Sequence, residues 1–308
     1  MHMDKSKLLV IVALFAVLMI FSGCVGGLGK PKEQVISGSQ AFAGGSQGLA
    51  VSFIAGQPPA QVFEGQPFAV AVQIDNKGEA DVSEAKVTLT GIDTSEQGFN
   101  LLSDVKVQTF SVEGVTKLDT TIAPGGQHVA IFDFGGRSIF ATSSFTAQAV
   151  VFYNYETRAL AAACLKENAF QQTIGGTEVC KISGVKAVQS SGAPIQVTSI
   201  EETPSGFLVK VRNSGKGTAF VRPAQLPESE TELTLTVRDR VAVSAEVAGQ
   251  TLVCTPSTIL LANGEGQTFC RMPDLTGRGD FVEQLQIILS YGYVDRASTT
   301  FSVQDVPV

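Results

Sequence analysis

The stretch that decides the fold is Phe68-Ala69-Val70-Ala71-Val72-Gln73-Ile74-Asp75-Asn76-Lys77-Gly78. Its large apolar side chains alternate with small or polar ones, which is the two-residue period of a strand with one buried face. The Asn-Lys-Gly that follows is typical of a tight turn, because Asn and Gly tolerate the backbone conformations that turns require. This stretch therefore predicts a half-buried strand that ends in a turn.

A second copy of the same arrangement lies further along the chain. Residues 207–211 alternate in the same way and lead into a turn that contains Asn213, as the first run leads into a turn that contains Asn76. Two apolar runs close on Tyr-x-Tyr, and the interval between their first tyrosines, Tyr153 and Tyr291, is nearly equal to the interval between the two asparagines. Because these landmarks keep one order and nearly one spacing, we interpret the chain as a tandem duplication.

Further alternating runs, with no long amphipathic helix and no βαβ rhythm, predict an all-β protein of two tandem Ig-like β-sandwich domains. We expect sandwich A at residues 50–190 and sandwich B at residues 193–308, each large enough to bury a core of its own. One of the runs, at 233–238, alternates Leu233, Leu235 and Val237 with polar residues and predicts a strand.

The motifs resemble those of known cell-surface proteins. A strand ending in Asn-x-Gly, a Pro-Gly-Gly hairpin at 124–126 and a closing aromatic strand are similar to the Ig-like modules of prokaryotic surface proteins called CARDB or S-layer-associated. Tyr153-Asn154-Tyr155-Glu156-Thr157, followed by Cys164, resembles a motif of a family of uncharacterised archaeal surface lipoproteins. The resemblance implies tandem Ig-like domains at the cell surface and supplies no catalytic residue.

Residues 1–23 predict an export signal of the lipoprotein type. Lys5 and Lys7 precede an unbroken apolar run at 8–21, which has the length of a signal-peptide core and is short for a spanning helix. Ser22-Gly23-Cys24 then resembles a lipobox, in which cleavage leaves the cysteine as the lipidated N-terminus. We expect lipidation at Cys24; an uncleaved N-terminal membrane anchor and plain secretion are the alternatives.

Composition and charge limit the partners. Residues 24–49 are rich in Gly, Ser, Gln and Ala and predict a flexible stalk. The formal net charge is -7 and the chain has no cluster of Lys or Arg, which excludes a nucleic-acid partner. We expect the membrane as a partner through the N-terminus, together with another envelope protein or a glycan.

No residue pattern predicts catalysis, a metal or a cofactor. His128 is the only histidine after the signal, and one imidazole completes neither a catalytic triad nor a typical zinc site. A G-x-S-x-G match at 44–48 lacks the strand and helix that this motif needs. Four carboxylates surround one turn without the spacing of a calcium loop and predict a solvated hairpin end: Asp75, Glu79, Asp81 and Glu84.

Four cysteines remain besides Cys24, and four cysteines allow three pairings. The intervals from Cys164 to Cys180 and from Cys254 to Cys270 are equal in length, and the second pair flanks the turn at 263–264. Because an exported chain meets an oxidising environment, we predict two structural disulfides, Cys164–Cys180 and Cys254–Cys270.

Together these features predict a lipoprotein that is tethered to the membrane and faces the outside of the cell. It would serve as a non-catalytic structural or interaction module in adhesion or envelope assembly. The alternative is an extracytoplasmic solute-binding component of a transporter, although such proteins usually bind in a cleft between α/β lobes.

Overall fold

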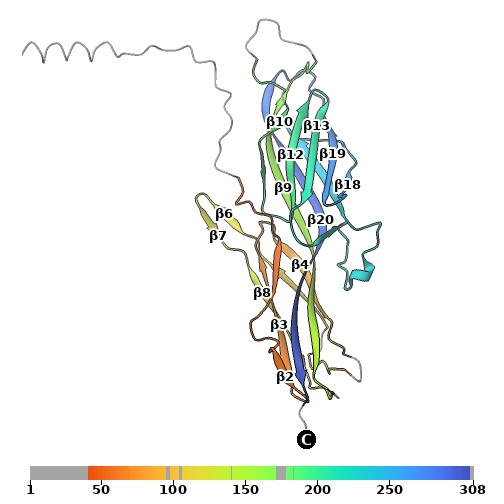
Figure 1. The fold of residues 1–308 in the computed structure, drawn as a ribbon. Coiled ribbons are helices and arrows are strands. Elements are labelled where there is room, and N and C mark those ends of the chain that lie inside the picture. Colours follow the sequence, from red (N-terminus) through yellow and green to blue (C-terminus); the bar gives the residue numbers. More distant parts are fainter. Residues whose placement is uncertain are drawn as a thin grey trace, which may run out of the picture. The chain divides into compact units, whose positions relative to one another are not determined.

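The computed structural model describes residues 41–94, 98–103, 106–139, 141–170, 178–182 and 184–305. The expected signal and its lipidation site, Cys24, lie outside the described residues. Apart from one short 3-10 turn, η1 (Glu230–Glu232), the described chain consists of strands and loops, and the predicted all-β sandwich fold is confirmed (Figure 1). Among the described residues, no helix is long and apolar enough to cross a membrane.

The strands form two halves, which we call half A and half B. In half A, a three-stranded sheet packs against part of the largest sheet. The three-stranded sheet consists of β1 (Leu49–Phe53), β3 (Phe68–Asn76) and β8 (Gln127–Phe134). The strands of the largest sheet that face it are β4 (Val82–Thr90) and β5 (Val107–Val112). Half B repeats this plan with β10 (Val185–Lys186), β12 (Ile195–Thr203), β13 (Gly206–Asn213), β19 (Glu265–Arg271) and β17 (Cys254–Thr255), facing β15 (Arg240–Val247), β16 (Gln250–Thr251) and β18 (Thr258–Leu260).

Short strands complete the sheets. They are β2 (Gln61–Phe63), β6 (Thr116–Leu118), β7 (Thr121–Ala123), β11 (Val188–Ser190) and β14 (Thr218–Phe220). β6 and β7 form a hairpin of their own, while β2 and β14 pair with β20 and β11 pairs with β9.

Two long strands run through both halves, β9 (Ser143–Leu165) and β20 (Phe281–Gln304) (Figure 1). They are antiparallel partners along their whole length, from Ser143 opposite Val303 to Leu165 opposite Phe281. β9 begins beside β4 in half A and ends in half B, whereas β20 begins beside β15 in half B and ends in half A. The stretches 50–190 and 193–308 therefore exchange the ends of their closing strands.

The turns after β3 and β13 have the same hydrogen bonds, which supports the duplication. Asn76 Oδ1 accepts the backbone N–H of Gly78, and Asn213 Oδ1 accepts that of Gly215, both at 3.1 Å. The two side-chain amides also donate to equivalent carbonyl groups, of Ala80 at 2.8 Å and Gly217 at 2.9 Å. The asparagine in each repeat thus closes its turn through its own side chain.

The prediction of a strand at 233–238 is wrong. Residues after η1 form turns, in which the backbone N–H groups of Val237 and Arg238 both donate to the Thr234 carbonyl at 3.1 Å. Leu233 is buried, whereas Leu235 is 88% exposed, so the apolar residues of this run do not share one buried face. Alternation in a short segment is also compatible with a turn that buries only some of its apolar residues.

Candidate functional site at the junction of the halves

All four tyrosines of the chain lie together where the two halves meet. In the β9–β20 register, Tyr155 is opposite Tyr291 and Tyr153 is opposite Tyr293, and all four are buried. Their ring centroids are 5.6 to 6.3 Å apart. The rings tie both long strands into one core at the junction.

The tyrosine hydroxyl groups form hydrogen bonds with backbone groups and with side chains of the neighbouring turns. The Tyr153 hydroxyl accepts the N–H of Leu49 at 3.2 Å, and the Tyr293 hydroxyl accepts that of Gly217 at 2.9 Å and donates to Asn213. Burial raises the pKa of these phenols above the ordinary value, so they stay neutral. We interpret the tyrosines as a fixed frame that positions the neighbouring residues of β9.

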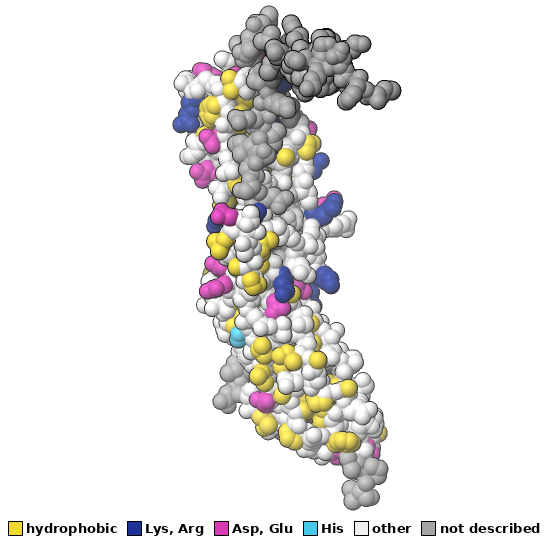
Figure 2. Space-filling view, turned by 90° about the vertical axis from the view of Figure 1, so that its left-hand side faces the viewer, with side chains coloured by type: hydrophobic (Ala, Val, Ile, Leu, Met, Phe, Trp, Pro, Cys, Tyr) yellow, Lys and Arg dark blue, Asp and Glu magenta, His cyan; other side chains and the backbone are white. Residues whose placement is uncertain are grey.

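A polar cavity of about 510 Å³ lies beside this frame, and we call it the junction cavity. It occupies a gap in the sheet: β4 pairs with β9 as far as Tyr153, and β11 pairs with it from Ala159. Three acidic and three basic side chains line the cavity: Glu79, Asp81, Glu156, Lys117, Arg158 and Arg222. Charged side chains of both signs also lie interspersed around the middle of the described body in Figure 2.

Several of these charged groups bind the protein itself. Asp81 accepts the backbone N–H of Gly114 at 2.7 Å, and Arg158 pairs with Glu156 at 2.8 Å. Two other groups keep unused hydrogen-bonding capacity. The Asn154 side-chain oxygen is buried without a partner, whereas Arg222 is exposed to solvent and has no hydrogen-bond or ion-pair partner among the described residues.

Glu79 holds the N-terminal segment against the junction. Its carboxylate accepts three backbone N–H groups, from Ala43 at 2.8 Å, Gly44 at 3.0 Å and Gly192 at 2.6 Å. Gly45 continues the contact, since its carbonyl accepts the N–H of Ala193 at 3.2 Å. Residues 41–49, which belong to the expected stalk, therefore bind the body, and residues 24–40 lie outside the described part.

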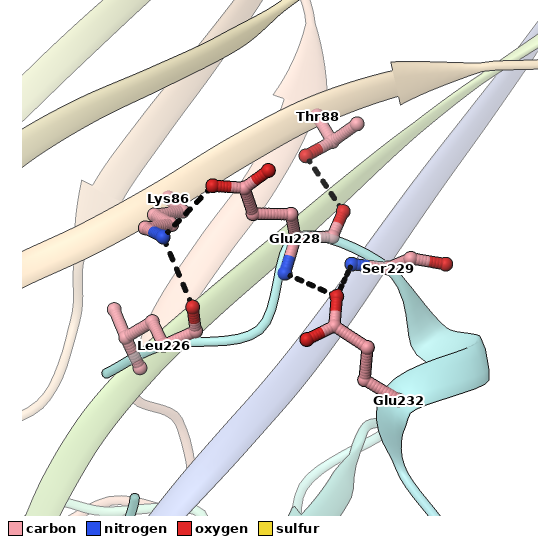
Figure 3. Close-up of polar contacts among 6 residues, drawn as sticks. All are labelled: Lys86, Thr88, Leu226, Glu228, Ser229 and Glu232. Carbon is pink, nitrogen blue, oxygen red and sulfur yellow. Dashed lines mark hydrogen bonds and ion pairs between the residues drawn. The ribbon is translucent and has the colours of Figure 1, made fainter. Parts of the chain in front are cut away.

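In half B, a loop covers the surface near the position that corresponds to the junction cavity of half A. The loop, residues 221–239, crosses to β4, where the Lys86 ammonium group contacts the Leu226 carbonyl at 3.0 Å and the Glu228 carboxylate at 3.3 Å (Figure 3). The Glu232 carboxylate closes the loop by accepting the N–H groups of Glu228 and Ser229, both at 3.0 Å (Figure 3). The other side of the loop is held by an ion pair between Arg296 and Glu230.

Both predicted disulfides are present. Cys254 and Cys270 are direct partners on β17 and β19, with a Cα–Cα distance of 3.9 Å. Cys164, at the end of β9, is bonded to Cys180 with a Cα–Cα distance of 5.7 Å. The pairing predicted from spacing and export is confirmed.

Of the four carboxylates that the sequence grouped around one turn, Glu79 and Asp81 line the junction cavity, but the four do not form a metal site. Asp75 pairs with Lys77 at 3.1 Å, while Glu79 and Asp81 bind backbone N–H groups, so these two carboxylates are not simply the solvated hairpin end that we expected. No cluster of three or more potential metal ligands occurs within the described part of the chain. Asn154, Tyr155 and Glu156 of the Tyr-x-Tyr-Glu-Thr motif line the junction cavity, but the motif indicated a family resemblance and did not predict a cavity.

His128 predicts a pH dependence of stability. It lies on β8, stacked on Phe110 with ring centroids 4.3 Å apart, and burial lowers its pKa below the ordinary 6.5. The unfolded chain then binds the proton more tightly, so its contribution to stability is present above pH 6.5 and is lost as the pH falls through the lowered pKa. Urea titrations at a series of pH values should show that the free energy of unfolding falls as the pH is lowered through this range, and His128→Gln should remove that dependence. An unchanged pH dependence in the variant would contradict the assignment to His128.

Comparisons with known proteins identify no family for this chain. No family model matches it, and no curated protein matches it. A DUF4466 family protein from Parabacteroides merdae aligns with 78% of this chain and 98% of its own, with 8% identity and a TM-score of 0.19. Escherichia coli alpha-2-macroglobulin activated by porcine elastase aligns with 86% of this chain and 22% of its own, with 10% identity and a TM-score of 0.16. With TM-scores this low, neither structure informs the function.

Proposed function

We propose that the protein is a lipoprotein attached to the cell membrane at Cys24, with its β-sandwich body outside the cell. It acts as a non-catalytic structural or interaction module in adhesion or envelope assembly. The observation that carries the proposal is the pair of disulfides, Cys164–Cys180 and Cys254–Cys270, because such bonds persist in oxidising compartments outside the cytoplasm.

The docked N-terminal segment supports attachment from this end. Residues 41–49 bind the junction through Glu79, Gly45 and the start of β1, so the stalk that leads to Cys24 would start from a fixed point on the body. Lys117 adds a contact, since its ammonium group donates to the Phe42 carbonyl at 3.3 Å. The duplicated halves also agree with the resemblance to archaeal surface lipoproteins with tandem Ig-like domains.

The alternative, a solute-binding component of a transporter, is favoured by one observation, the junction cavity. Solute-binding components usually enclose their ligand between two lobes that close on it. Here β9 and β20 run unbroken through both halves, which leaves no hinge between them. The interaction module therefore remains our first proposal, and it is tested at the membrane.

Cys24→Ser tests the attachment. We expect the variant to keep its signal, or to leave the membrane fraction, because the serine cannot receive the thioether-linked lipid. Fractionation of cells followed by intact mass measurement would detect either result, with Arg271→Ala, a change at an exposed residue of β19, as the control variant that retains the lipobox and both disulfides. Unchanged mass together with unchanged membrane retention of Cys24→Ser would contradict lipidation and favour the uncleaved anchor.

A further inference from the structure

The junction cavity has a counterpart in half B, and the counterpart is filled. Ser83 follows the turn asparagine Asn76 at the same interval at which Phe220 follows Asn213, so Ser83 and Phe220 occupy equivalent places in the repeats. In the β9–β20 register, Asn154 is opposite Gly292, and the duplication relates these two positions as well.

In half B this place is a small apolar core. Phe220, at the end of β14, pairs with Gly292, and a side chain on Gly292 would overlap the Phe220 ring. Val294 and Leu233 contribute to the packing, together with Val150 and Phe152 of β9, and all four are buried with Phe220. Burial of apolar surface here stabilises the half.

Half A has polar residues at the same positions. Ser83 replaces Phe220, Asn154 replaces Gly292, and Glu156 replaces Val294, and all three line the junction cavity. An apolar filling would stabilise half A as it does half B, whereas polar groups that lack partners cost free energy. The unpartnered oxygen of Asn154 is therefore difficult to explain by structure alone and indicates a ligand.

The chemistry of the walls points to the class of ligand. Three carboxylates and three cations balance one another, so the cavity selects neither an anion nor a cation. The exposed donors of Arg222 and the unpartnered acceptor oxygen of Asn154 suit hydroxyl groups, which both donate and accept hydrogen bonds. Its volume of about 510 Å³ falls within the ~300–1,000 Å³ of small-molecule pockets, but its walls are more polar than most.

An added peptide strand fits less well. The uncovered edge of β9 spans only residues 154–158, and Ser191 already binds both backbone groups of Arg158, at 3.0 and 2.8 Å. Strand addition requires a longer free edge. We propose that the junction cavity binds a neutral sugar unit of a surface glycan, an inference that rests on the proposed location outside the cell.

Binding is tested with the full-length chain in a detergent that has no sugar headgroup. An array of neutral and acidic glycans should show binding to neutral glycans, and calorimetry with the best neutral disaccharide should give its dissociation constant. Arg222→Ala should weaken this binding at least about tenfold, because Arg222 has no partner among the described residues to lose. Arg271→Ala, which removes an exposed arginine from β19 in half B, should leave the constant unchanged.

A second variant transfers the half B residues into half A. Ser83→Phe combined with Asn154→Gly should abolish sugar binding and keep a cooperative thermal transition, since the cavity is then filled as in half B. Binding of acidic glycans or peptides alone, no binding of any neutral glycan, or full binding by Arg222→Ala would each overturn the proposal. If the unaltered protein, purified from cells, proved soluble and unlipidated and yet bound neutral glycan, the membrane attachment would be refuted. The proposed sugar site would then still hold.

Discussion

Phe301→Ala is expected to lower the free energy of unfolding by about 3–5 kcal/mol and to loosen half A. Phe301 lies near the end of β20, at the end of the second repeat, yet its ring packs in the first half. Its centroid is 5.2 Å from that of Phe68 and 5.7 Å from that of Phe145, and the side chain is only 2% exposed. Truncation of Phe301 therefore leaves a cavity in the core of half A, although β20 belongs to the second repeat.

Hydrogen exchange followed by mass spectrometry shows which half loses protection. We expect faster exchange in β3 and β8 of Phe301→Ala, with the free energy taken from urea unfolding. The matched control is Leu289→Ala, a buried residue of the same strand that pairs with β15, which should loosen half B instead. If Phe301→Ala increased hydrogen exchange only in half B, the result would contradict the placement of the end of β20 in half A.

The alternating pattern predicted the sheets well because it reports burial directly. The run at 68–74 forms β3 and the run at 207–211 forms β13, each with its large apolar residues inside. The Asn-x-Gly turns were recognisable because the asparagine acts within a few residues of itself. A two-residue period and a turn closed by its own asparagine both depend on residues that are close together in the sequence, so both can be predicted from it.

The exchange of strand ends was not predicted, because a period of two residues says nothing about which sheet a strand joins. One signal was present, the absence of Gly and Pro from 143–165, which left β9 uninterrupted for 23 residues. Ordinary strands have about five or six residues. A run of this length is compatible with a strand that serves two sandwiches in succession.

The junction cavity could not be predicted from the sequence, for a different reason. Its walls come from residues 41–42, from the turn after β3 and the start of β4, from β6, β9 and the residues next to β11, and from Arg222. These segments are distant along the chain. Glu79 was noticed only as one of four nearby carboxylates, whereas its three backbone partners depend on where residues 43–44 and Gly192 meet. Such convergence follows from the tertiary fold and leaves no spacing to recognise.

Reduction of the disulfides is expected to destabilise half B selectively, by about 3 kcal/mol for each bond in the chain-entropy estimate. Both bonds lie in this half: Cys254–Cys270 joins β17 to β19, and Cys164–Cys180 fixes the end of β9 next to Glu202 of β12. Each closes a loop with the same sequence separation of 16 residues, so the entropic model predicts equal effects.

The variants Cys164→Ala with Cys180→Ala and Cys254→Ala with Cys270→Ala separate the two bonds. Urea unfolding should give similar losses for both, and hydrogen exchange should show faster opening of β12, β13 and β19 while β3 and β8 stay protected. A chemical reductant applied to the unaltered chain should reproduce the combined pattern. Loss of protection in half A first, or unchanged stability in both variants, would show that the bonds do not stabilise half B. Selective loss would instead show that half B reaches its full stability only while Cys164–Cys180 and Cys254–Cys270 remain oxidised.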